Sequence, residues 1–222
     1  MKMQKADLKL DWCNYKLAKY ACENWHYSRS IPTPPYNMIG VWENGKYVGC
    51  IIFSRGANKD LGKPFGLKQI EVCELSRVAL NNHVNTVTKM ISIAIKLLLK
   101  RSPGIKLIIS FADKNQNHEG VIYKAGNWIY LGKTSKSFLY IDENGKKYHP
   151  RQVSPTGLKI QYGNIRKVPT PDSLNRIEQL PKYRFAYPVT KSMRQELESK
   201  AADSQSEKGG AVPTLAHHKG VI

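Results

Sequence analysis

One stretch of the chain constrains the fold more than any other, because a strand, a long helix and a second strand follow one another between residues 70 and 112. Residues 87–101 carry their apolar side chains on one helical face, and Ser102-Pro103-Gly104 ends that helix. Residues 106–112 form a short apolar run, typical of a strand buried on both faces of a sheet. This order predicts an α/β sandwich with a mixed sheet and crossover helices.

The remaining segments extend this architecture. A helix is expected at residues 11–24, with Asp11 as its N-cap. Asn44-Gly45 and Asn144-Gly145 are strong signals for two-residue hairpin turns. The other predicted elements are strands at 38–43, 46–55, 128–131, 137–141, 147–153 and 184–187, a short helix at 119–125 and a surface helix at 191–200. We therefore expect one domain over residues 1–200 and a flexible, polar tail over residues 201–222.

The charge of the chain points to a polyanionic partner. Its 222 residues include 35 lysines and arginines against 17 acidic residues, a formal net charge of +18. Such an excess attracts polyanions over long range. A membrane surface is the competing partner, but no basic amphipathic helix with a bulky apolar face is found in the sequence. Nucleic acid is therefore favoured.

Targeting signals and cysteine spacing indicate a soluble protein of the cytoplasm. No apolar run is long enough to cross a bilayer, and the N-terminus lacks the apolar block of a signal peptide. The four cysteines are widely spaced and include no Cys-x-x-Cys pair, so free thiols are expected. The expected location is the cytoplasm, that of the host cell if a phage encodes the protein.

The segment Ile122-Tyr123-Lys124-Ala125-Gly126-Asn127-Trp128 resembles an element of the GNAT acetyltransferase fold. In that fold a tyrosine on the short helix after the fifth strand lies by the thioester sulfur, where its phenol can protonate a leaving thiolate. The resemblance gives Tyr123 this role. The alternative is that its ring only packs against the sheet.

In the same fold, the junction after the central strand holds the coenzyme A pyrophosphate on backbone amides at a helix N-terminus. The corresponding residues here are 78–87, which contain no glycine, although the usual phosphate loop is rich in glycine. Asparagines tolerate the special backbone angles of such a loop. An ordinary polar turn is the alternative. The candidate cofactor-binding residues are Val78, Leu80, Asn82, His83, Asn85 and Thr86.

Several blocks resemble the Mom family of phage DNA-modification proteins. They are residues 26–28 (HYS), 40–55, 66–80 (GLKQIEVCELSRVAL), 110–132 (SFADKNQNHEGVIYKAGNWIYLG) and 182–188 (KYRFAYP), so that the resemblance extends over roughly residues 20–190. It implies a GNAT-like fold and conversion of DNA adenine to N6-carbamoylmethyladenine, which protects DNA from restriction. Acetyl-CoA is the implied donor, double-stranded DNA the implied substrate, and iron is a cofactor associated with the family.

The resemblance also implies four catalytic residues, which are Tyr27, Arg77, Asp113 and Tyr123. Tyr27 would stack on or hydrogen-bond a flipped base, or else anchor its loop. Arg77 lies on a strand with apolar neighbours and needs an anion, either the cofactor or Glu74. Asp113 follows a buried strand, where it would accept a proton from the adenine amine or bind metal; a helix N-cap is its rival role.

The metal ligands and the bond-forming route stay open. His26 and His118 are candidate iron ligands because imidazole suits iron, but no ligand triad is evident from their spacing. Simple acyl transfer to adenine would leave an N6-acetyl group, whereas a carbamoylmethyl group needs a new N–CH2 bond and a source of amide nitrogen. Neither the route, the DNA sequence preference nor the oligomeric state follows from the sequence.

Two other functions remain in competition. The first is a conventional acetyl-CoA-dependent N-acetyltransferase acting on a protein or small-molecule amine, which the missing glycine-rich loop disfavours. The second is a non-catalytic phage protein that binds DNA through its charge. The presence of all four implied catalytic residue types disfavours this second alternative.

Overall fold

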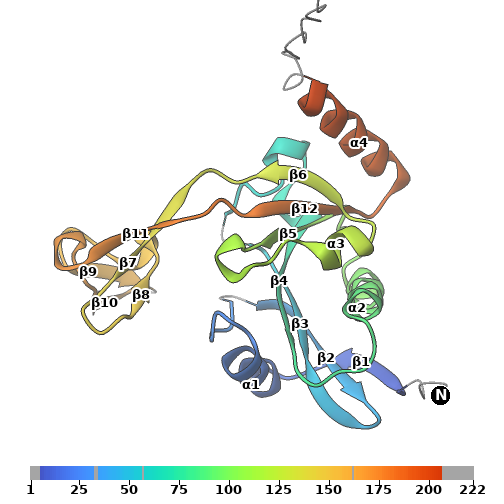
Figure 1. The fold of residues 1–222 in the computed structure, drawn as a ribbon, viewed down its shortest axis with the longest axis horizontal. Coiled ribbons are helices and arrows are strands. Elements are labelled where there is room, and N and C mark those ends of the chain that lie inside the picture. The colour runs from blue at the N-terminus through green and yellow to red at the C-terminus, as the bar shows by residue number, and fades with distance from the viewer. Residues whose placement is uncertain (1–5, 33–34, 57, 162, 207–222) are drawn as a thin grey trace, which may run out of the picture. The chain divides into compact units, whose positions relative to one another are not determined.

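A computed structural model describes residues 6–32, 35–56, 58–161 and 163–206. Its largest sheet has seven strands in the order β1-β2-β3-β4-β5-β12-β6 (Figure 1). The pairs from β1 to β4 are antiparallel and the β4–β5 pair is parallel, so the predicted α/β class with a mixed sheet is confirmed. The strands of this sheet are β1 (Leu8–Trp12), β2 (Pro35–Glu43), β3 (Lys46–Ser54), β4 (Val72–Leu80), β5 (Leu107–Ala112), β6 (Ile129–Lys133) and β12 (Tyr183–Pro188).

The chain divides into two compact units. The first comprises residues 1–109, 122–131 and 186–222, and the second comprises residues 110–121 and 132–185. The first unit holds helices α1 (Tyr15–Trp25), α2 (Val87–Arg101) and α4 (Lys191–Ser206), together with most of α3 (Val121–Ala125). The second holds the three-stranded sheet β11-β7-β8 and the two-stranded sheet β10-β9. These strands are β7 (Ser137–Ile141), β8 (Lys147–Tyr148), β9 (Leu158–Gln161), β10 (Asn164–Lys167) and β11 (Asn175–Gln179).

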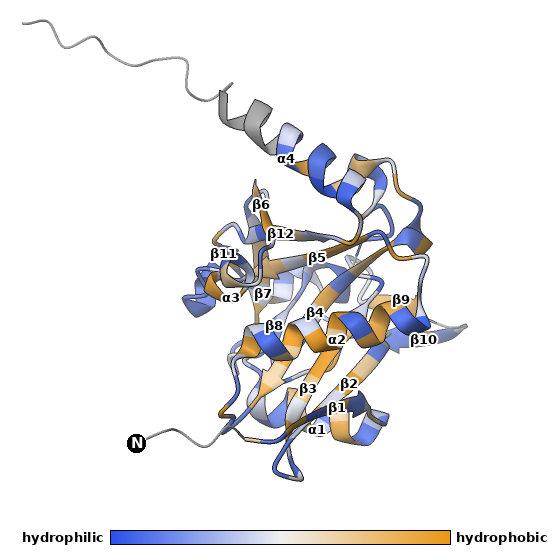
Figure 2. Cartoon of the chain, turned by 90° about the vertical axis from the view of Figure 1, so that its right-hand side faces the viewer, coloured by the Kyte–Doolittle hydropathy of each residue, from blue (hydrophilic) through white to orange (hydrophobic). Residues whose placement is uncertain are grey.

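Strand β3 is the centre of the first unit, because helices cover the sheet on both faces there. Cys50 and Ile52 are fully buried with the apolar side of α1, whose buried residues are Ala18, Ala21 and Cys22. Successive side chains of a strand point to opposite faces, so Ile51 and Phe53 face away from α1. Helix α2 lies on that other side, alongside the strands (Figure 2). Its buried residues are Met90, Ile91, Ala94, Ile95 and Leu98.

The first Asn-Gly turn forms as predicted, whereas the second lies in a longer loop between the paired residues Ile141 and Lys147, in which Gly145 has positive φ and Asn144 does not. Asn44 and Gly45 have φ angles of 49° and 75°, and they join β2 to β3. Both central residues of a type I′ turn need positive φ, which Asn and Gly adopt most readily. The second turn joins β7 to β8, where Asp142 Oδ1 accepts hydrogen bonds from the amides of Asn144 and Lys146. β8 ends at Tyr148, earlier than the predicted 147–153, because Pro150 lacks an N–H and begins a 3₁₀ turn.

The first predicted helix starts later than expected. Its N-cap is Asn14, whose Oδ1 accepts a hydrogen bond from the Leu17 amide at 2.9 Å, and not Asp11. Asp11 lies in β1, where it pairs with Gly40 of β2. The sequence Leu-Lys-Leu-Asp-Trp alternates apolar and polar residues, and this period of two is the signal of an edge strand that the helical interpretation missed.

The C-terminal and central boundaries also shift. The helix predicted to end at Lys200 continues to Ser206, and residues 207–222 of the predicted tail lie outside the described residues. The strand predicted to start at Ile70 starts at Val72, and Ile70 lies in a 3₁₀ turn with 73% of its surface exposed. The single domain over residues 1–200 stays a prediction.

The four cysteines are free thiols, as expected. Cys22, Cys50 and Cys73 are buried free thiols, and Cys13 is a half-buried one. Within the described ranges, no helix is both long and apolar enough to cross a membrane.

Candidate active site

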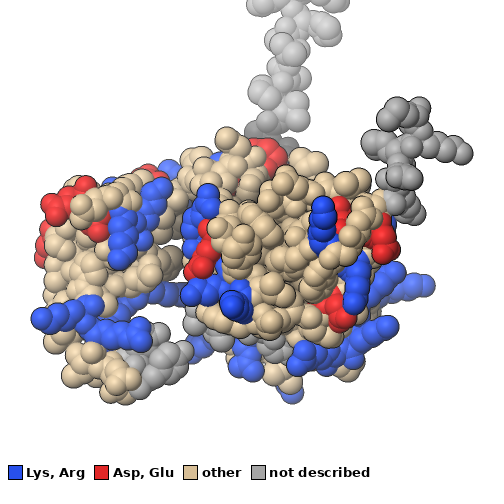
Figure 3. All heavy atoms as spheres, turned by 90° about the horizontal axis from the view of Figure 1, so that it is seen from below, with Lys and Arg blue, Asp and Glu red and all other residues tan. Residues whose placement is uncertain are grey.

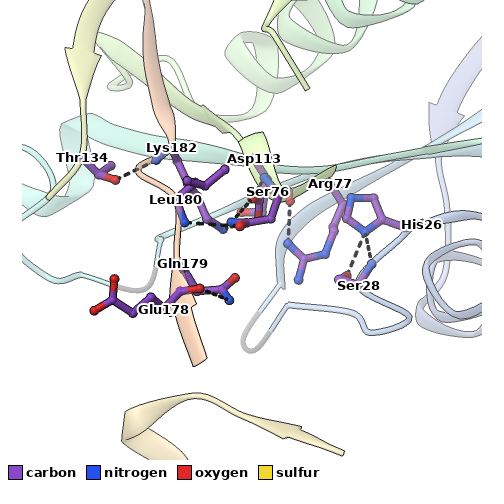
Figure 4. Close-up of polar contacts among 11 residues, drawn as sticks. His26, Ser28, Ser76, Arg77, Asp113, Thr134, Glu178, Gln179, Leu180 and Lys182 are labelled. Atoms are coloured by element: carbon purple, nitrogen blue, oxygen red, sulfur yellow. Dashed lines mark hydrogen bonds and ion pairs between the residues drawn. The ribbon is translucent and has the colours of Figure 1, made fainter. Parts of the chain in front are cut away.

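Tyr27 lies in the turn that follows α1, with its ring available at the surface. The side chain is 42% exposed, and its ring lies against the His26 ring with a centroid distance of 4.3 Å. The His26 ring is in turn held by Ser28, whose backbone amide donates to Nδ1 at 3.1 Å and whose Oγ lies 2.8 Å from Nδ1 (Figure 4). The result is a pair of stacked rings with one polar edge fixed.

Arg77 of β4 ties this turn to the sheet. Its Nε donates to the Ser30 carbonyl at 3.1 Å and its Nη1 to the Ser76 carbonyl at 2.7 Å. Two backbone carbonyls are therefore partners of the Arg77 side chain, in addition to the cofactor or Glu74 that the sequence left open. Tyr27 and Arg77 are therefore brought into one neighbourhood, with Ser30 as the link.

A β-bulge accompanies Arg77. Ile52 of β3 pairs with Arg77 and Phe53 pairs with Leu75, so that Ser76 is the extra residue on β4. Its hydroxyl hydrogen-bonds the Ser54 hydroxyl and the Glu74 carbonyl. The Ser76 side chain is thus bonded to neighbouring protein groups, and the bulge changes the direction of the side chains that follow it.

The turn expected to bind pyrophosphate contains a left-handed asparagine, but its backbone amides already bind a carboxylate of the protein. Asn82 adopts a left-handed conformation with φ of 48°. The Glu43 carboxylate at the end of β2 accepts hydrogen bonds from the Val84 amide at 2.6 Å and from the Asn85 amide at 2.7 Å. It also accepts one from the Asn85 side chain at 2.9 Å. An internal carboxylate therefore takes two of the backbone amides that precede α2.

Glu43 is ionised in this position. The residue is only 5% exposed, and burial by itself raises the pKa of its carboxyl group. The hydrogen bonds from Val84 and Asn85 and the neighbouring His83 outweigh burial and leave that pKa below its usual value. A diphosphate bound to the same amides would have to displace this carboxylate or lie against its charge. The residues at 81–86 therefore do not fit the pyrophosphate of coenzyme A in the predicted way.

The other predicted residues of this turn have structural partners. His83 Nδ1 lies 2.9 Å from the Asn85 carbonyl, and the Asn85 side chain also donates to the Ala6 carbonyl at 3.1 Å. Leu80 ends β4 and pairs with Gly49. Thr86 is the N-cap of α2 without a side-chain hydrogen bond to the helix. Val78 pairs with Ile51 within the sheet.

Asp113 lies in the second unit, directly after β5, and is held from two sides. Its Oδ1 accepts hydrogen bonds from the amide and the side chain of Asn115 at 3.0 Å and 2.9 Å. Its Oδ2 pairs with the Lys182 ammonium at 2.9 Å (Figure 4). The rival role of helix N-cap is observed, because Asp113 caps the 3₁₀ turn Lys114–Gln116.

These partners keep Asp113 charged. The residue is 7% exposed, and burial raises the pKa of its carboxyl group. The Lys182 ammonium and the Asn115 hydrogen bonds outweigh that effect and bring the pKa below its usual value. A carboxylate of this kind is a weak base at neutral pH but a strong hydrogen-bond acceptor. Lys182 itself is fixed through its backbone amide, which donates to Thr134 Oγ1 at 3.0 Å.

Tyr123 is packed rather than exposed. It is 8% exposed on α3, and its ring lies 5.1 Å from that of Trp128. Trp128 continues the aromatic stack to Tyr187 at 5.5 Å. The ring of Tyr123 therefore packs in the interior of the protein, and its catalytic role stays a prediction.

The described residues do not fit a protein-built metal centre. Among them, no group of three or more His, Cys, Asp and Glu side chains is arranged to hold a metal ion. His26 hydrogen-bonds Ser28, and His118 is an exposed residue whose amide donates to the Asp113 carbonyl. The donor set for the iron associated with the family is thus not assembled in the described ranges.

Sequence reasoning missed Glu43, Asn115 and Lys182. Glu43 lies 41 residues before Val84, and Lys182 lies 69 residues after Asp113, so no local spacing joins these pairs. In the sequence, Lys182 is marked only as part of the 182–188 block, and Glu43 only as the last residue before a hairpin turn. A buried charge needs a partner, and this rule applies to Asp113 at the end of a buried strand as it does to Arg77. It predicts that such a partner exists but does not say which residue it is.

The model of the Mom protein family matches residues 7–204 of the chain. A curated relative, the methylcarbamoylase Mom of Escherichia phage Mu, is 26% identical over 200 residues, which are 87% of this chain and 80% of that protein.

Solved acetyltransferase structures also align with the chain. One is a GNAT family acetyltransferase from Elizabethkingia anophelis with acetyl-CoA bound, with a TM-score of 0.44, 11% identity, and coverage of 83% of this chain and 100% of that one. Another is an aminoglycoside acetyltransferase in complex with coenzyme A and kanamycin, with a TM-score of 0.46, 10% identity, and coverage of 86% and 99%. At these TM-scores the likeness carries no argument about ligands.

Proposed function

Because the chain belongs to the Mom protein family, we propose that it is a transferase that converts adenine in double-stranded DNA to N6-carbamoylmethyladenine. The name of the phage Mu relative, a methylcarbamoylase, supports the group that is transferred. The net charge of +18 supports a polyanionic substrate. Modification of this kind would protect the DNA that carries it from restriction.

The observation that carries the proposal is the exposed Tyr27 ring, stacked on His26 and fastened to the sheet through Arg77. The amino group of an adenine inside a duplex is out of reach, so an enzyme must extrude the base and hold it. A rigid aromatic ring at the surface is suited to stack on an extruded base. In this proposal Tyr27 binds the base, and Arg77 positions the turn that carries it.

Asp113 of the second unit and Tyr123 of the first have proposed roles of their own. The ionised Asp113 carboxylate would accept a hydrogen bond from an N–H group of the substrate, with Lys182 keeping it charged. The Tyr123 phenol would act as a proton donor, while its ring packs on Trp128. Acetyl-CoA as the donor rests on the resemblance alone, because Glu43 takes amides that were expected to hold its diphosphate.

The proposal is tested by mass spectrometry of nucleosides from bacterial DNA after expression of the protein. The decisive variant is Asp113→Asn, and Asp142→Asn is its matched control. Asp142 is another carboxylate of the second unit that accepts backbone hydrogen bonds, at the β7–β8 turn. We expect an adenosine heavier by a carbamoylmethyl group with the wild type and with Asp142→Asn, and its absence with Asp113→Asn.

Two other results would overturn the proposal. N6-acetyladenosine in the same DNA would show simple acyl transfer. Unmodified DNA from a folded wild-type protein that acetylates a free amine would show a conventional N-acetyltransferase.

A further inference from the structure

Strands β9 and β10 form a two-stranded ribbon that belongs to neither of the larger sheets. Backbone hydrogen bonds continue beyond the paired residues Leu158 and Lys167. The Val168 amide donates to the Gly157 carbonyl at 2.9 Å, and the Ser154 amide donates to the Pro169 carbonyl at 3.1 Å. Residues 163–167 are all exposed. A two-stranded hairpin without a covering layer is marginally stable in water, so a free ribbon calls for a partner.

The ribbon has two chemically different faces. Ile160 pairs directly with Ile165, and these residues are 78% and 70% exposed. On the other face, Lys159 pairs directly with Arg166. Exposed isoleucines gain nothing from burial, and like charges opposite each other destabilise a strand pair. The Lys159–Arg166 pair therefore weakens the ribbon, and the Ile160–Ile165 pair leaves apolar surface in water.

The chain segment that contains the ribbon carries charge of a single sign. The 28 residues from 144 to 171 contain six lysines and arginines and no aspartate or glutamate. The Lys159 ammonium donates to the Arg151 carbonyl, which brings the backbone of another basic residue to the same place. Figure 3 shows Lys and Arg side chains at the surface of the protein. Such a concentration of positive charge repels itself in the free protein and contributes favourably to the free energy of binding a polyanion.

We infer that the β9–β10 ribbon is a contact surface for double-stranded DNA. A two-stranded ribbon has the width that the major groove of B-DNA accepts. Lys159, Arg166 and Lys167 would contact phosphates, and the Ile160–Ile165 pair would contact base methyl groups or the sugar wall of the groove. This inference rests on the proposed function for its DNA substrate, and it adds the element that grips the duplex.

The test measures binding of a fluorescent 30-base-pair duplex as a function of salt. The ribbon variant carries Lys159→Gln, Arg166→Gln and Lys167→Gln. The control carries Lys96→Gln, Lys100→Gln and Lys124→Gln, which remove the same charge from exposed helical positions. We expect the ribbon variant to bind on the order of 10- to 100-fold more weakly, with a salt slope shallower by about 2 to 3. Equal affinities of the two variants would overturn the inference.

A second measurement needs no substitution. Hydrogen–deuterium exchange of the wild-type protein is expected to slow in residues 158–167 when the duplex is added. Unchanged exchange in that segment at saturating DNA would overturn the inference, as would ribbon-dependent binding to anionic phospholipid vesicles with no effect on DNA affinity.

The binding assay also separates this inference from the proposed function. A wild-type protein that binds DNA through the ribbon but leaves adenine unmodified would contradict only the proposed function. A ribbon variant that binds and modifies DNA as well as the control would contradict only the DNA-contact role of the ribbon.

Discussion

At the scale of single residues, Glu43 and Asp113 pose the same physical problem and solve it in the same way. Each is a nearly buried carboxylate that stays charged because donors from distant parts of the chain reach it. Such charge-assisted hydrogen bonds are stronger than neutral ones. Removing one partner leaves the others unsatisfied, and this makes both residues good subjects for substitution.

Glu43→Ala is expected to lower the free energy of unfolding by about 3 kcal/mol, because it strands the amides of Val84 and Asn85 and the Asn85 side chain. Glu43→Gln keeps one acceptor and should cost less. The pKa of Glu43 is below its usual 4.5 in the folded protein, so its stabilising contribution is present above pH 4.5 and is lost as the pH falls below that value.

Chemical denaturation at several pH values measures both effects. Glu143→Gln, at an exposed position, is the control and should leave the free energy of unfolding unchanged. If Glu43→Gln shows the same acid dependence of stability as the wild type below pH 4.5, the hydrogen-bonded carboxylate is not the cause.

Lys182→Met is expected to raise the pKa of Asp113 toward its ordinary value, because the ammonium that stabilises the carboxylate is removed. If Asp113 must be ionised for DNA modification, the acid limb of the activity profile moves to higher pH. The profile is measured by nucleoside analysis of duplex DNA incubated with the protein over a pH series. Lys136→Met, another exposed lysine of the second unit, should leave that limb in place.

At the scale of elements, the start of α1 distinguishes the observed fold from the one expected from the sequence. Asn14→Ala removes the side-chain cap on the Leu17 amide and should destabilise the protein by about 1 kcal/mol. Asp11→Ala changes an exposed residue of the edge strand β1 and should cost less than about 0.5 kcal/mol. Thermal and chemical unfolding of both variants shows whether Asn14 or Asp11 caps the first helix. A larger effect at Asp11 would restore the longer helix.

At the scale of the whole molecule, the excess of positive charge sets how the protein meets DNA. With a net charge of +18 and 6 to 10 phosphate contacts, affinity for a duplex should fall by about 10³- to 10⁵-fold between 50 and 200 mM salt. Fluorescence anisotropy at several salt concentrations measures the slope. A flat salt dependence would show that the charge serves another purpose than binding nucleic acid.

The sequence by itself determined the elements whose signals are local. Residues 87–101 became α2 within the predicted bounds because apolar periodicity and a Pro-Gly stop act over one or two turns. The Asn44-Gly45 turn formed because Asn and Gly adopt positive φ more readily than other residues. The buried strand before Asp113 followed from its continuous apolar run. The resemblance brought forward Tyr27, Arg77, Asp113 and Tyr123, whose catalytic roles stay predictions.

Only the tertiary structure decided where the charges find their partners. A hydrogen bond joins Glu43 to Val84 and an ion pair joins Asp113 to Lys182, and a spacing of tens of residues leaves no periodic trace in the sequence. The role of residues 8–12 as an edge strand likewise depends on β2 lying beside them. Local sequence patterns determine whether a segment forms a helix, a strand or a turn, whereas tertiary contacts determine which segments lie side by side. The binding of the Glu43 carboxylate by the amides before α2 is such a tertiary contact.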